Sequence, residues 1–232
     1  MKIKVVKKIK KKMIKKVRPI YLCSPKRAKD TLPLPLIEFS LIKDKIDYQG
    51  CDTLMFTSKQ AIYYTNELDK NWIKYPVIAI GSVTKEVAKS FGAKVIYQPA
   101  NFYGEELAKD ILKFFKDRKI LYIRPKVVSF DSKSFLEKEG VWIKEEIIYK
   151  TSCVEYKDKT LQKNAIIIFT SPSTIKCFFK NFKWDDSFIA VVIGKSTLKN
   201  LPSYVKAVVA NTPTIDSCIE KAKSIQKIEK NL

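Results

Sequence analysis

The triplet Phe56-Thr57-Ser58 recurs later in the chain as Phe169-Thr170-Ser171. A second motif behaves in the same way, because Ile80-Gly81-x-x-Thr84 recurs as Ile193-Gly194-x-x-Thr197. The separation is 113 residues in both cases, from 56 to 169 and from 80 to 193. A constant offset between two separate motifs indicates two copies of one structural unit. Each copy is predicted to form a strand, a Thr-Ser turn, a helix, a second strand, a glycine turn and a second helix.

The sequence around the first copy predicts a parallel α/β sheet. The expected strands are Thr53–Phe56, Val77–Ile80, Val95–Tyr97, Lys119–Ile123 and Trp142–Tyr149. The expected helices are Lys59–Leu68, Thr84–Phe91, Gly104–Phe115 and Phe130–Glu139, and Gly92 and Gly140 suit the ends of two of them. Five strands that alternate with four helices are typical of a parallel sheet.

The sequence around the second copy contains fewer strands. The expected strands are Ala165–Phe169, Phe188–Ile193 and Val205–Val209, with helices at Ser173–Phe182, Thr197–Leu201 and Thr214–Ile228. A strand at 19–23 and the extended segment near 34–39 can complete this sheet. The residues between them, 25–33, are too few for a crossover helix.

This arrangement predicts that one domain is inserted into the other. The first domain comprises 18–37 plus 157–232, the second comprises 43–150, and the linker segments are 38–42 and 150–156. We expect two similar flavodoxin-like parallel-sheet domains joined by this two-segment linker, which would act as a hinge. A cleft between them is the expected ligand site, since clefts between domains commonly bind ligands.

The composition excludes several kinds of chemistry. The chain has no histidine, which removes Ser-His-Asp and Cys-His catalysis and His-ligated metals. Its five cysteines are scattered and never spaced as Cys-x-x-Cys, so we expect reduced thiols, no disulfide framework and no metal site. No run of about 18 apolar residues occurs, and lysines interrupt the apolar runs near the start. We therefore expect a cytoplasmic protein without a membrane span or a secretory signal.

A formal net charge of +21 suggests an anionic partner. However, residues 1–17 hold nine lysines and no acidic residue, and the remaining positive charge is spread along the chain. This basic extension could bind nucleic acid or a membrane surface, but we expect it to be disordered, or to precede a start at Met13. Because the other charges are not concentrated beside aromatic residues, no specific nucleic acid and no membrane are expected as partners.

The Thr-Ser turns are candidates for ligand binding. Thr57 and Ser58, like Thr170 and Ser171, follow apolar strands, where α/β proteins bind ligands and where helix N-termini favour anions. The alternative is ordinary N-capping of the following helix, for which serine and threonine are preferred. The sequence leaves both interpretations open. A P-loop is not expected at Gly194-Lys195-Ser196, because the earlier glycine of that motif is missing.

Two further groups of residues carry expectations. The acidic pairs Glu105-Glu106, Glu145-Glu146 and Asp185-Asp186 are expected on the solvated surface, because adjacent carboxylates diverge on a helix or strand. Tyr149 ends a strand beside a predicted linker segment, so its hydroxyl is expected to reach the cleft.

Together these residues resemble the uroporphyrinogen-III synthase family over almost the whole chain after residue 18. The resemblance rests on the order and spacing of short motifs, which are Pro35-Leu36-Ile37-Glu38, Phe56-Thr57-Ser58, Ile80-Gly81 with Thr84, Ala88 and Gly92, Gly104-Glu105-x-Leu107, Arg124-Pro125, Tyr149-Lys150-Thr151, Phe169-Thr170-Ser171-Pro172-Ser173, and Ile193-Gly194 with Thr197. Two features depart from the family: a full helix after the first strand is missing, and Ser24-Pro25 replaces the Arg-Pro common at the end of that strand.

The resemblance implies a lyase that closes linear hydroxymethylbilane into uroporphyrinogen III, with inversion of ring D and loss of water, in haem biosynthesis. It implies no cofactor, no metal, and a monomer that acts on a polycarboxylate substrate. Tyr149 is then the expected catalytic residue, which assists departure of the hydroxyl group. The implied substrate-binding residues are Thr57, Ser58, Ser82, Thr84, Gly104, Thr170, Ser171, Ser173 and Thr197. The alternative is a non-catalytic two-domain binder of an anionic small molecule.

Overall fold

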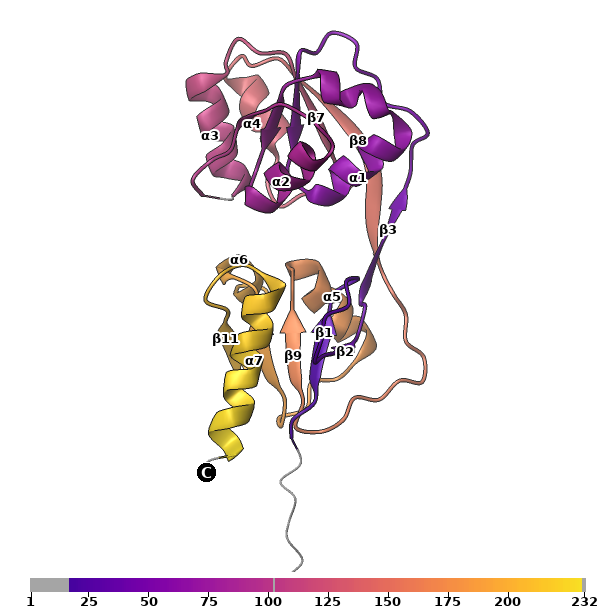
Figure 1. Cartoon of the computed structure of the whole chain (residues 1–232), viewed down its shortest axis with the longest axis vertical. Coiled ribbons are helices and arrows are strands. Elements are labelled where there is room, and N and C mark those ends of the chain that lie inside the picture. The colour runs from indigo at the N-terminus through magenta and orange to yellow at the C-terminus, as the bar shows by residue number, and fades with distance from the viewer. Residues whose placement is uncertain (1–16, 102, 231–232) are drawn as a thin grey trace, which may run out of the picture. The chain divides into compact units, whose positions relative to one another are not determined.

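The computed structural model describes residues 17–101 and 103–230 (Figure 1). The chain divides into two compact units. Unit 1 consists of the segment through Glu38 together with Cys153–Leu232, and unit 2 consists of Phe39–Ser152. Apart from Val17, the expected basic extension at 1–17 lies outside the described residues.

Unit 2 is built on a six-stranded sheet in the order β3-β8-β7-β4-β5-β6. Its strands are β3 (Ile37–Leu41), β4 (Thr53–Phe56), β5 (Val77–Ala79), β6 (Val95–Tyr97), β7 (Ile120–Pro125) and β8 (Ile143–Cys153). Its helices are α1 (Lys59–Leu68), the 3-10 helix η1 (Lys70–Lys74), α2 (Ser82–Ser90), α3 (Gly104–Phe114) and α4 (Ser132–Lys138). The strands from β4 to β8 pair in parallel, so the predicted parallel α/β sheet is confirmed.

Both faces of this sheet are buried under helices, and the alternation along each strand assigns every side chain to one face. Leu54 and Phe56 of β4 belong to one buried cluster with Ile62 of α1. Met55 lies between them in sequence and belongs to a second cluster with Ile111 of α3. Helices α1 and α2 therefore cover one face, and α3 and α4 cover the other (Figure 1).

The expected helix stops in unit 2 are confirmed. Gly92 follows the C-terminal end of α2 with φ of 91°, and Gly140 follows α4 with φ of 78°. Both values lie in the left-handed region that glycine adopts without a steric penalty. These two turns return the chain to the sheet at β6 and β8.

Unit 1 is built on a five-stranded parallel sheet in the order β11-β10-β9-β1-β2. Its strands are β1 (Ile20–Cys23), β2 (Leu32–Pro33), β9 (Ile166–Phe169), β10 (Ile189–Val192) and β11 (Ala207–Val209), and its helices are α5 (Pro172–Asn181), α6 (Lys195–Leu198) and α7 (Ile215–Lys230). This is the flavodoxin-like order 2-1-3-4-5. In unit 2 the parallel strands β4 to β8, numbered 1 to 5 along the chain, lie in the order 3-2-1-4-5. The two sheets therefore differ in the connectivity of their strands.

The expected strand near 34–39 was wrong in one respect. The edge strand of unit 1 is formed by Leu32–Pro33, and the chain then enters β3, which lies beside β8 in the other sheet. Pro35 has no N–H group to donate, so pairing with β1 cannot continue past Leu34, whose N–H donates to Leu22 O at 3.0 Å. Residues 24–31 contain no helix, as their short length predicts.

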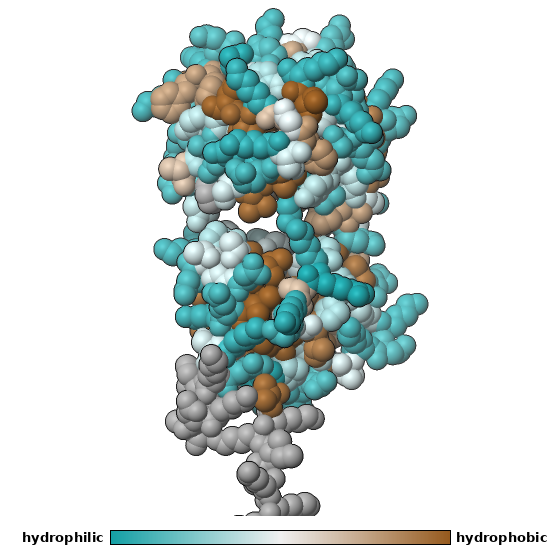
Figure 2. Space-filling model, viewed as in Figure 1, coloured by the Kyte–Doolittle hydropathy of each residue, from teal (hydrophilic) through white to brown (hydrophobic). Residues whose placement is uncertain are grey.

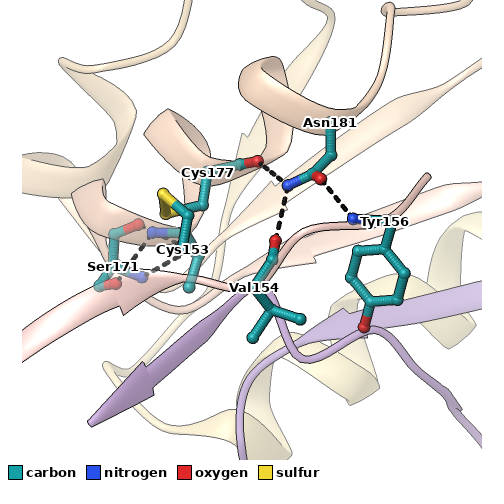
Figure 3. The surroundings of a disulfide bond; sticks show 7 residues. Cys153, Val154, Tyr156, Ser171, Cys177 and Asn181 are labelled. Carbon is teal, nitrogen blue, oxygen red and sulfur yellow. Dashed lines mark hydrogen bonds between the residues drawn. A yellow bond between two sulfur atoms is a disulfide. The ribbon is translucent and has the colours of Figure 1, made fainter. Parts of the chain in front are cut away.

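A disulfide joins Cys153 and Cys177 within unit 1, with a Cα–Cα distance of 5.3 Å (Figure 3). The expectation of reduced thiols is therefore wrong for this pair. It was based on spacing in the sequence, whereas the two cysteines meet because α5 packs beside the end of β8 and the residues that follow it. The other cysteines are free; Cys23 and Cys218 are buried, and Cys51 is half-buried.

Asn181, the last residue of α5, binds the backbone of the residues that follow Cys153. Its side-chain nitrogen donates to Val154 O at 2.9 Å and to Cys177 O at 2.8 Å, and its side-chain oxygen accepts from the Tyr156 N–H at 2.8 Å (Figure 3). One amide thus satisfies three backbone groups, and with the disulfide it holds 153–156 against α5.

Figure 2 shows hydrophilic side chains spread over the viewed face of both units, with apolar residues in separate groups. No helix in 17–101 or 103–230 has the length and apolar content needed to cross a membrane.

The disulfide yields a prediction about stability. Its sequence separation of 24 residues corresponds to about 3 kcal/mol of stabilisation through restriction of the unfolded chain. Under non-reducing denaturing conditions the protein should therefore expose three titratable thiols, and reduction should lower the urea midpoint. The control is Cys177→Ser, whose midpoint should already be low and should not respond to reductant. Five titratable thiols in the denatured protein before reduction would contradict the bond.

Candidate functional site

The connections at the carboxyl edge of unit 2 diverge between β4 and β7. The chain leaves β4 towards β5 and β6, and then crosses back through α3 to β7 on the other side of β4. Open α/β sheets bind ligands at such a switch point, outside the carboxyl ends of the strands. The Thr57-Ser58 turn follows β4, and the segment that follows β7 begins at Pro125.

A cavity of ≈190 Å³ lies at this switch point, and we call it the Thr57 pocket. Its lining consists of Thr57, Ser58, Ile80, Gly104, Tyr122, Pro125, Val127, Val128, Ser129, Phe130 and Ser132. Every lining residue except Tyr122 lies at or beyond the carboxyl end of a strand, so the loops and helix N-termini form the walls. The pocket combines an apolar wall with several hydroxyl groups, a mixture that is typical of small-molecule sites.

Two tyrosines hold the two hydroxyls of the Thr-Ser turn. Tyr122 OH lies 2.8 Å from Thr57 Oγ1, and Tyr149 OH donates to Ser58 Oγ at 3.0 Å. Tyr122 comes from β7 and Tyr149 from β8. The two strands that follow the crossover therefore fix the turn that follows β4.

The contacts of Ser58 determine what its hydroxyl can still do. Its oxygen accepts from the Gln60 N–H at 3.1 Å, which caps α1, and from Tyr149 OH. A serine hydroxyl has two acceptor lone pairs and one donor proton. Both lone pairs are in use, so the proton of Ser58 remains available for a ligand in the pocket. Capping and ligand binding are therefore compatible at this residue.

Both tyrosine hydroxyls are protonated at neutral pH. Burial raises the pKa of Tyr149 to about 12, against the opposing effect of its hydrogen bond to Ser58. Burial also raises the pKa of Tyr122, although the hydrogen bond to Thr57 and the Arg124 charge partly offset this. A buried phenol in this state is a proton donor and not a base.

Tyr149 is fixed by packing as well as by its hydrogen bond. Its side chain is only 2% exposed, and its ring lies 5.4 Å from the Tyr64 ring and 6.0 Å from the Phe39 ring, centroid to centroid. Tyr64 belongs to α1 and Phe39 to β3. The phenol therefore has little freedom to turn away from Ser58.

The helix that begins at this turn favours an anion. The first turn of α1 contains no acidic residue, so the partial positive charge of its N-terminus is not compensated. The first turn of α3, which begins at Gly104, contains Glu105 and Glu106, which form ion pairs with Lys109. A carboxylate ligand is therefore expected at the α1 side of the pocket.

An internal ion pair shapes the pocket segment 125–130. Arg124 donates to Glu145 through two bonds of 2.6 Å and 2.8 Å, and its side chain is only 13% exposed. Its remaining nitrogen donates to Pro125 O at 2.9 Å and to Lys126 O at 3.3 Å. Arg124 thus ties the start of the segment to the end of the sheet.

The prediction that the pair Glu145-Glu146 lies on the solvated surface was wrong. Glu145 is mostly covered by Arg124, and Glu146 is buried and paired with Lys43. Adjacent carboxylates on a strand point to opposite faces, and each face here supplies its own cation. For Glu105-Glu106 the prediction is confirmed, since both are exposed.

Gly104 allows α3 to approach the pocket wall closely. A Cβ atom at this position would lie 3.1 Å from Phe130 Cβ, closer than an ordinary contact. Phe130 packs in turn on Phe135 of α4, with 5.6 Å between ring centroids. Any larger residue at 104 would therefore push against the wall of the Thr57 pocket.

The other predicted site residues do not line this pocket, and Tyr149 reaches it only through its hydrogen bond to Ser58. In unit 2, Ser82 is exposed at the start of α2 and Thr84 is buried in that helix. In unit 1, Thr170 donates to Cys23 O at 3.0 Å, and Ser171 forms a capping box with Thr174. The remaining predicted residues of unit 1 are Ser173, which is exposed, and Thr197, which is buried in α6.

Sequence reasoning missed Tyr122 and Ser132, which both line the pocket. Tyr122 precedes Ile123 at the end of a predicted strand, and the alternation of that strand could have placed its ring on the α3 face. Nothing in the sequence indicated Ser132, because the helix was predicted to begin at Phe130, which placed Ser132 inside the helix and not at its start. Among the described residues, no group of His, Cys, Asp or Glu side chains has the arrangement of a metal site.

The chain matches the family described as "Uroporphyrinogen-III synthase HemD" over residues 26–220. Among solved structures it is similar to uroporphyrinogen-III synthetase from Helicobacter pylori 26695, with 24% identity and a TM-score of 0.74 over 90% of this chain and 99% of that one. It is also similar in fold to a mutant uroporphyrinogen III synthase from the extremely thermophilic bacterium Thermus thermophilus, with 12% identity and a TM-score of 0.59 over 90% and 99% of the two chains. No curated protein sequence matches it.

The family match covers most of the chain, including both Thr-Ser turns and the whole lining of the Thr57 pocket. The chain therefore belongs to the uroporphyrinogen-III synthase family, whose members are lyase-type enzymes of tetrapyrrole and haem biosynthesis.

Proposed function

We propose that the protein cyclises hydroxymethylbilane to uroporphyrinogen III, with inversion of ring D and loss of one water. The single observation that carries this proposal in the structure is the pair of buried tyrosine hydroxyls bonded to the Thr57-Ser58 turn at the switch point. Family membership favours a synthase and disfavours a non-catalytic binder.

The chemistry needs a proton donor at the leaving hydroxyl. Tyr149 keeps its proton at neutral pH and donates to Ser58, which leaves the Ser58 proton for a group in the pocket. We assign Tyr149 the role of the acid, with Ser58 passing a proton to the leaving hydroxyl while Tyr149 replaces it. Departure of water leaves an azafulvene cation. The substituted carbon of ring D attacks it to give a spiro intermediate, which fragments and recloses, and the proton released at closure restores Tyr149.

The Thr57 pocket suits one part of this substrate. Its ≈190 Å³ is smaller than the roughly 300–1,000 Å³ that drug-sized ligands occupy, so it can hold one substituted pyrrole ring and not four. The apolar segment 127–130 would cover the ring and exclude water from the cation. A carboxylate of that ring would lie near Thr57 and the N-terminus of α1.

Further carboxylate contacts are assigned to the remaining predicted residues. Each lies after a strand of its own sheet or in the first turns of a helix, where backbone N–H groups lack partners within the helix. They are Ser82, Thr84 and Gly104 in unit 2, and Thr170, Ser171, Ser173 and Thr197 in unit 1. Because Thr170 and Ser171 already use their side chains in structural hydrogen bonds, we assign their contribution to the backbone.

We also propose that the enzyme acts as a cytoplasmic monomer and needs no metal or cofactor, because the proton relay and the anion contacts come from its own side chains. No specific nucleic acid or membrane partner is proposed.

The direct test is an isomer assay. Hydroxymethylbilane is supplied, the product is oxidised, and porphyrin isomers I and III are separated. Spontaneous closure gives isomer I, so the protein should shift the product to isomer III. If a protein that is shown to be folded by a cooperative unfolding transition gives isomer I alone, the proposed activity is wrong.

Replacing Tyr149 tests the proton relay. Tyr149→Phe should lower kcat about a hundredfold, at the low end of general-acid effects, because Ser58 and water can still deliver a proton. KM should change much less, since the ring and its packing remain. Tyr204→Phe is the control, because the Tyr204 side chain is exposed in unit 1 and should leave kcat unchanged. An unchanged kcat in Tyr149→Phe would remove the assigned role.

Replacing Arg124 tests how the pocket segment is held. Arg124→Met should lower the free energy of unfolding by about 2 kcal/mol, because it leaves Glu145 unpaired and mostly buried. It should also raise KM, because the carbonyl groups of Pro125 and Lys126 lose their donor.

The double variant Arg124→Met with Glu145→Met separates the two effects. It should recover most of the stability while KM stays high, measured by urea unfolding and the isomer assay. Lys133→Met is the control, since it removes an exposed ion pair with Glu137 and should cost less than about 0.5 kcal/mol. Recovery of KM in the double variant would show that the carbonyl contacts do not shape the pocket.

A further inference from the structure

The hydroxyl of Ser132 is buried and has no hydrogen-bond partner among the described residues. The residue is only 1% exposed. Its backbone N–H is occupied, because it donates to Phe130 O at 3.1 Å. The side-chain oxygen alone is left unpaired.

An unpaired buried hydroxyl is unfavourable, with a cost of roughly 1–3 kcal/mol. Two other buried hydroxyls of unit 2 avoid this cost. Thr65 donates to Ala61 O at 2.7 Å, and Thr53 donates to Asp52 at 2.6 Å. Tyr48 is also unpaired, but it does not line the Thr57 pocket.

Ser132 has no evident role in forming its helix. The N-cap of α4 is Asp131, whose side chain accepts from the Ser134 N–H at 3.0 Å and from the Ser134 hydroxyl at 2.7 Å. An alanine at 132 would be a better helix former than serine and would bury no polar group. The fold alone therefore gives no reason for a hydroxyl at this position.

The position of Ser132 supplies a reason. It lines the Thr57 pocket together with the hydroxyl-bearing residues Thr57 and Ser58. These two are attached to strand β4, whereas Ser132 comes from the segment after β7, on the other side of the switch point. Hydroxyl-bearing residues from both sides of the switch point therefore line the pocket.

We propose that Ser132 is a substrate-binding residue whose hydroxyl donates to a carboxylate of the single pyrrole ring that enters the Thr57 pocket. This inference rests on the proposed function and adds a specificity contact to it. Hydrogen bonds to a charged acceptor are the strong ones, so the ligand would offset the cost of burying the hydroxyl. Such a group lowers the stability of the free protein in exchange for affinity.

The test compares Ser132→Ala with Thr65→Val. Ser132→Ala removes one unpaired oxygen and adds no atom, so its urea midpoint should equal or exceed that of the wild type. Its KM for hydroxymethylbilane should rise about tenfold or more, with kcat within about twofold. Thr65→Val removes a paired hydroxyl outside the pocket, so it should lower the midpoint and leave KM unchanged.

A binding measurement separates this inference from the proposed activity. Uroporphyrin III, the oxidised product, serves as the probe, and its Kd is followed by fluorescence. Weaker binding of the probe by Ser132→Ala supports the contact between Ser132 and a carboxylate. This holds even if the wild type forms no isomer III, and in that case only the proposed activity is wrong. An unchanged KM and Kd in Ser132→Ala overturns the inference, and so does a large loss of stability in that variant, because the hydroxyl would then have a structural partner.

Discussion

The site depends on the parallel pairing of β4 with β7. This register sets Phe56 beside Ile123, so the turn that follows β4 meets the side chain of Tyr122 and the start of the segment that follows β7. Because the crossover through α3 brings the chain to β7, no other strand can occupy this place beside β4. A shift of one residue would reverse the faces of β7 and turn Tyr122 away from α3 and Thr57. The pocket therefore depends first on the register between β4 and β7, which decides which side chains can line it.

The proposed transfer of a proton from Tyr149 through Ser58 to the substrate does not need a histidine. The Tyr149 phenol is buried, which keeps it protonated, and the Ser58 oxygen already accepts two hydrogen bonds, which leaves its own proton for a ligand. In the proposed relay, burial keeps the Tyr149 phenol protonated and two accepted hydrogen bonds leave the Ser58 proton free for a ligand. Both conditions are set by the strands and by the cap of α1.

The sequence predicted the class of fold and most elements because apolar runs and glycine stops are local signals. The strand at Thr53–Phe56 and the helix at Lys59–Leu68 have the predicted bounds. Features that depend on pairing across the chain were missed. The Cys153–Cys177 bond needs α5 beside 153–156, and the burial of Glu146 needs Lys43 from the loop that follows β3. Ser132 could not be identified either, since its unpaired oxygen becomes evident only when its surroundings are known.

The repeated triplet supports different tasks in the two units. In unit 1, Thr170 donates to the Cys23 carbonyl and Ser171 closes a capping box, so both hydroxyl groups are committed to fixed backbone acceptors or donors. In unit 2, the partners of Thr57 and Ser58 are phenols, which can donate or accept and can release a bond to a ligand. The sequence of the triplet is kept in both units by the same need to cap a helix after a strand. The chemistry then follows from the neighbouring strands, where unit 1 presents a carbonyl and unit 2 presents a tyrosine.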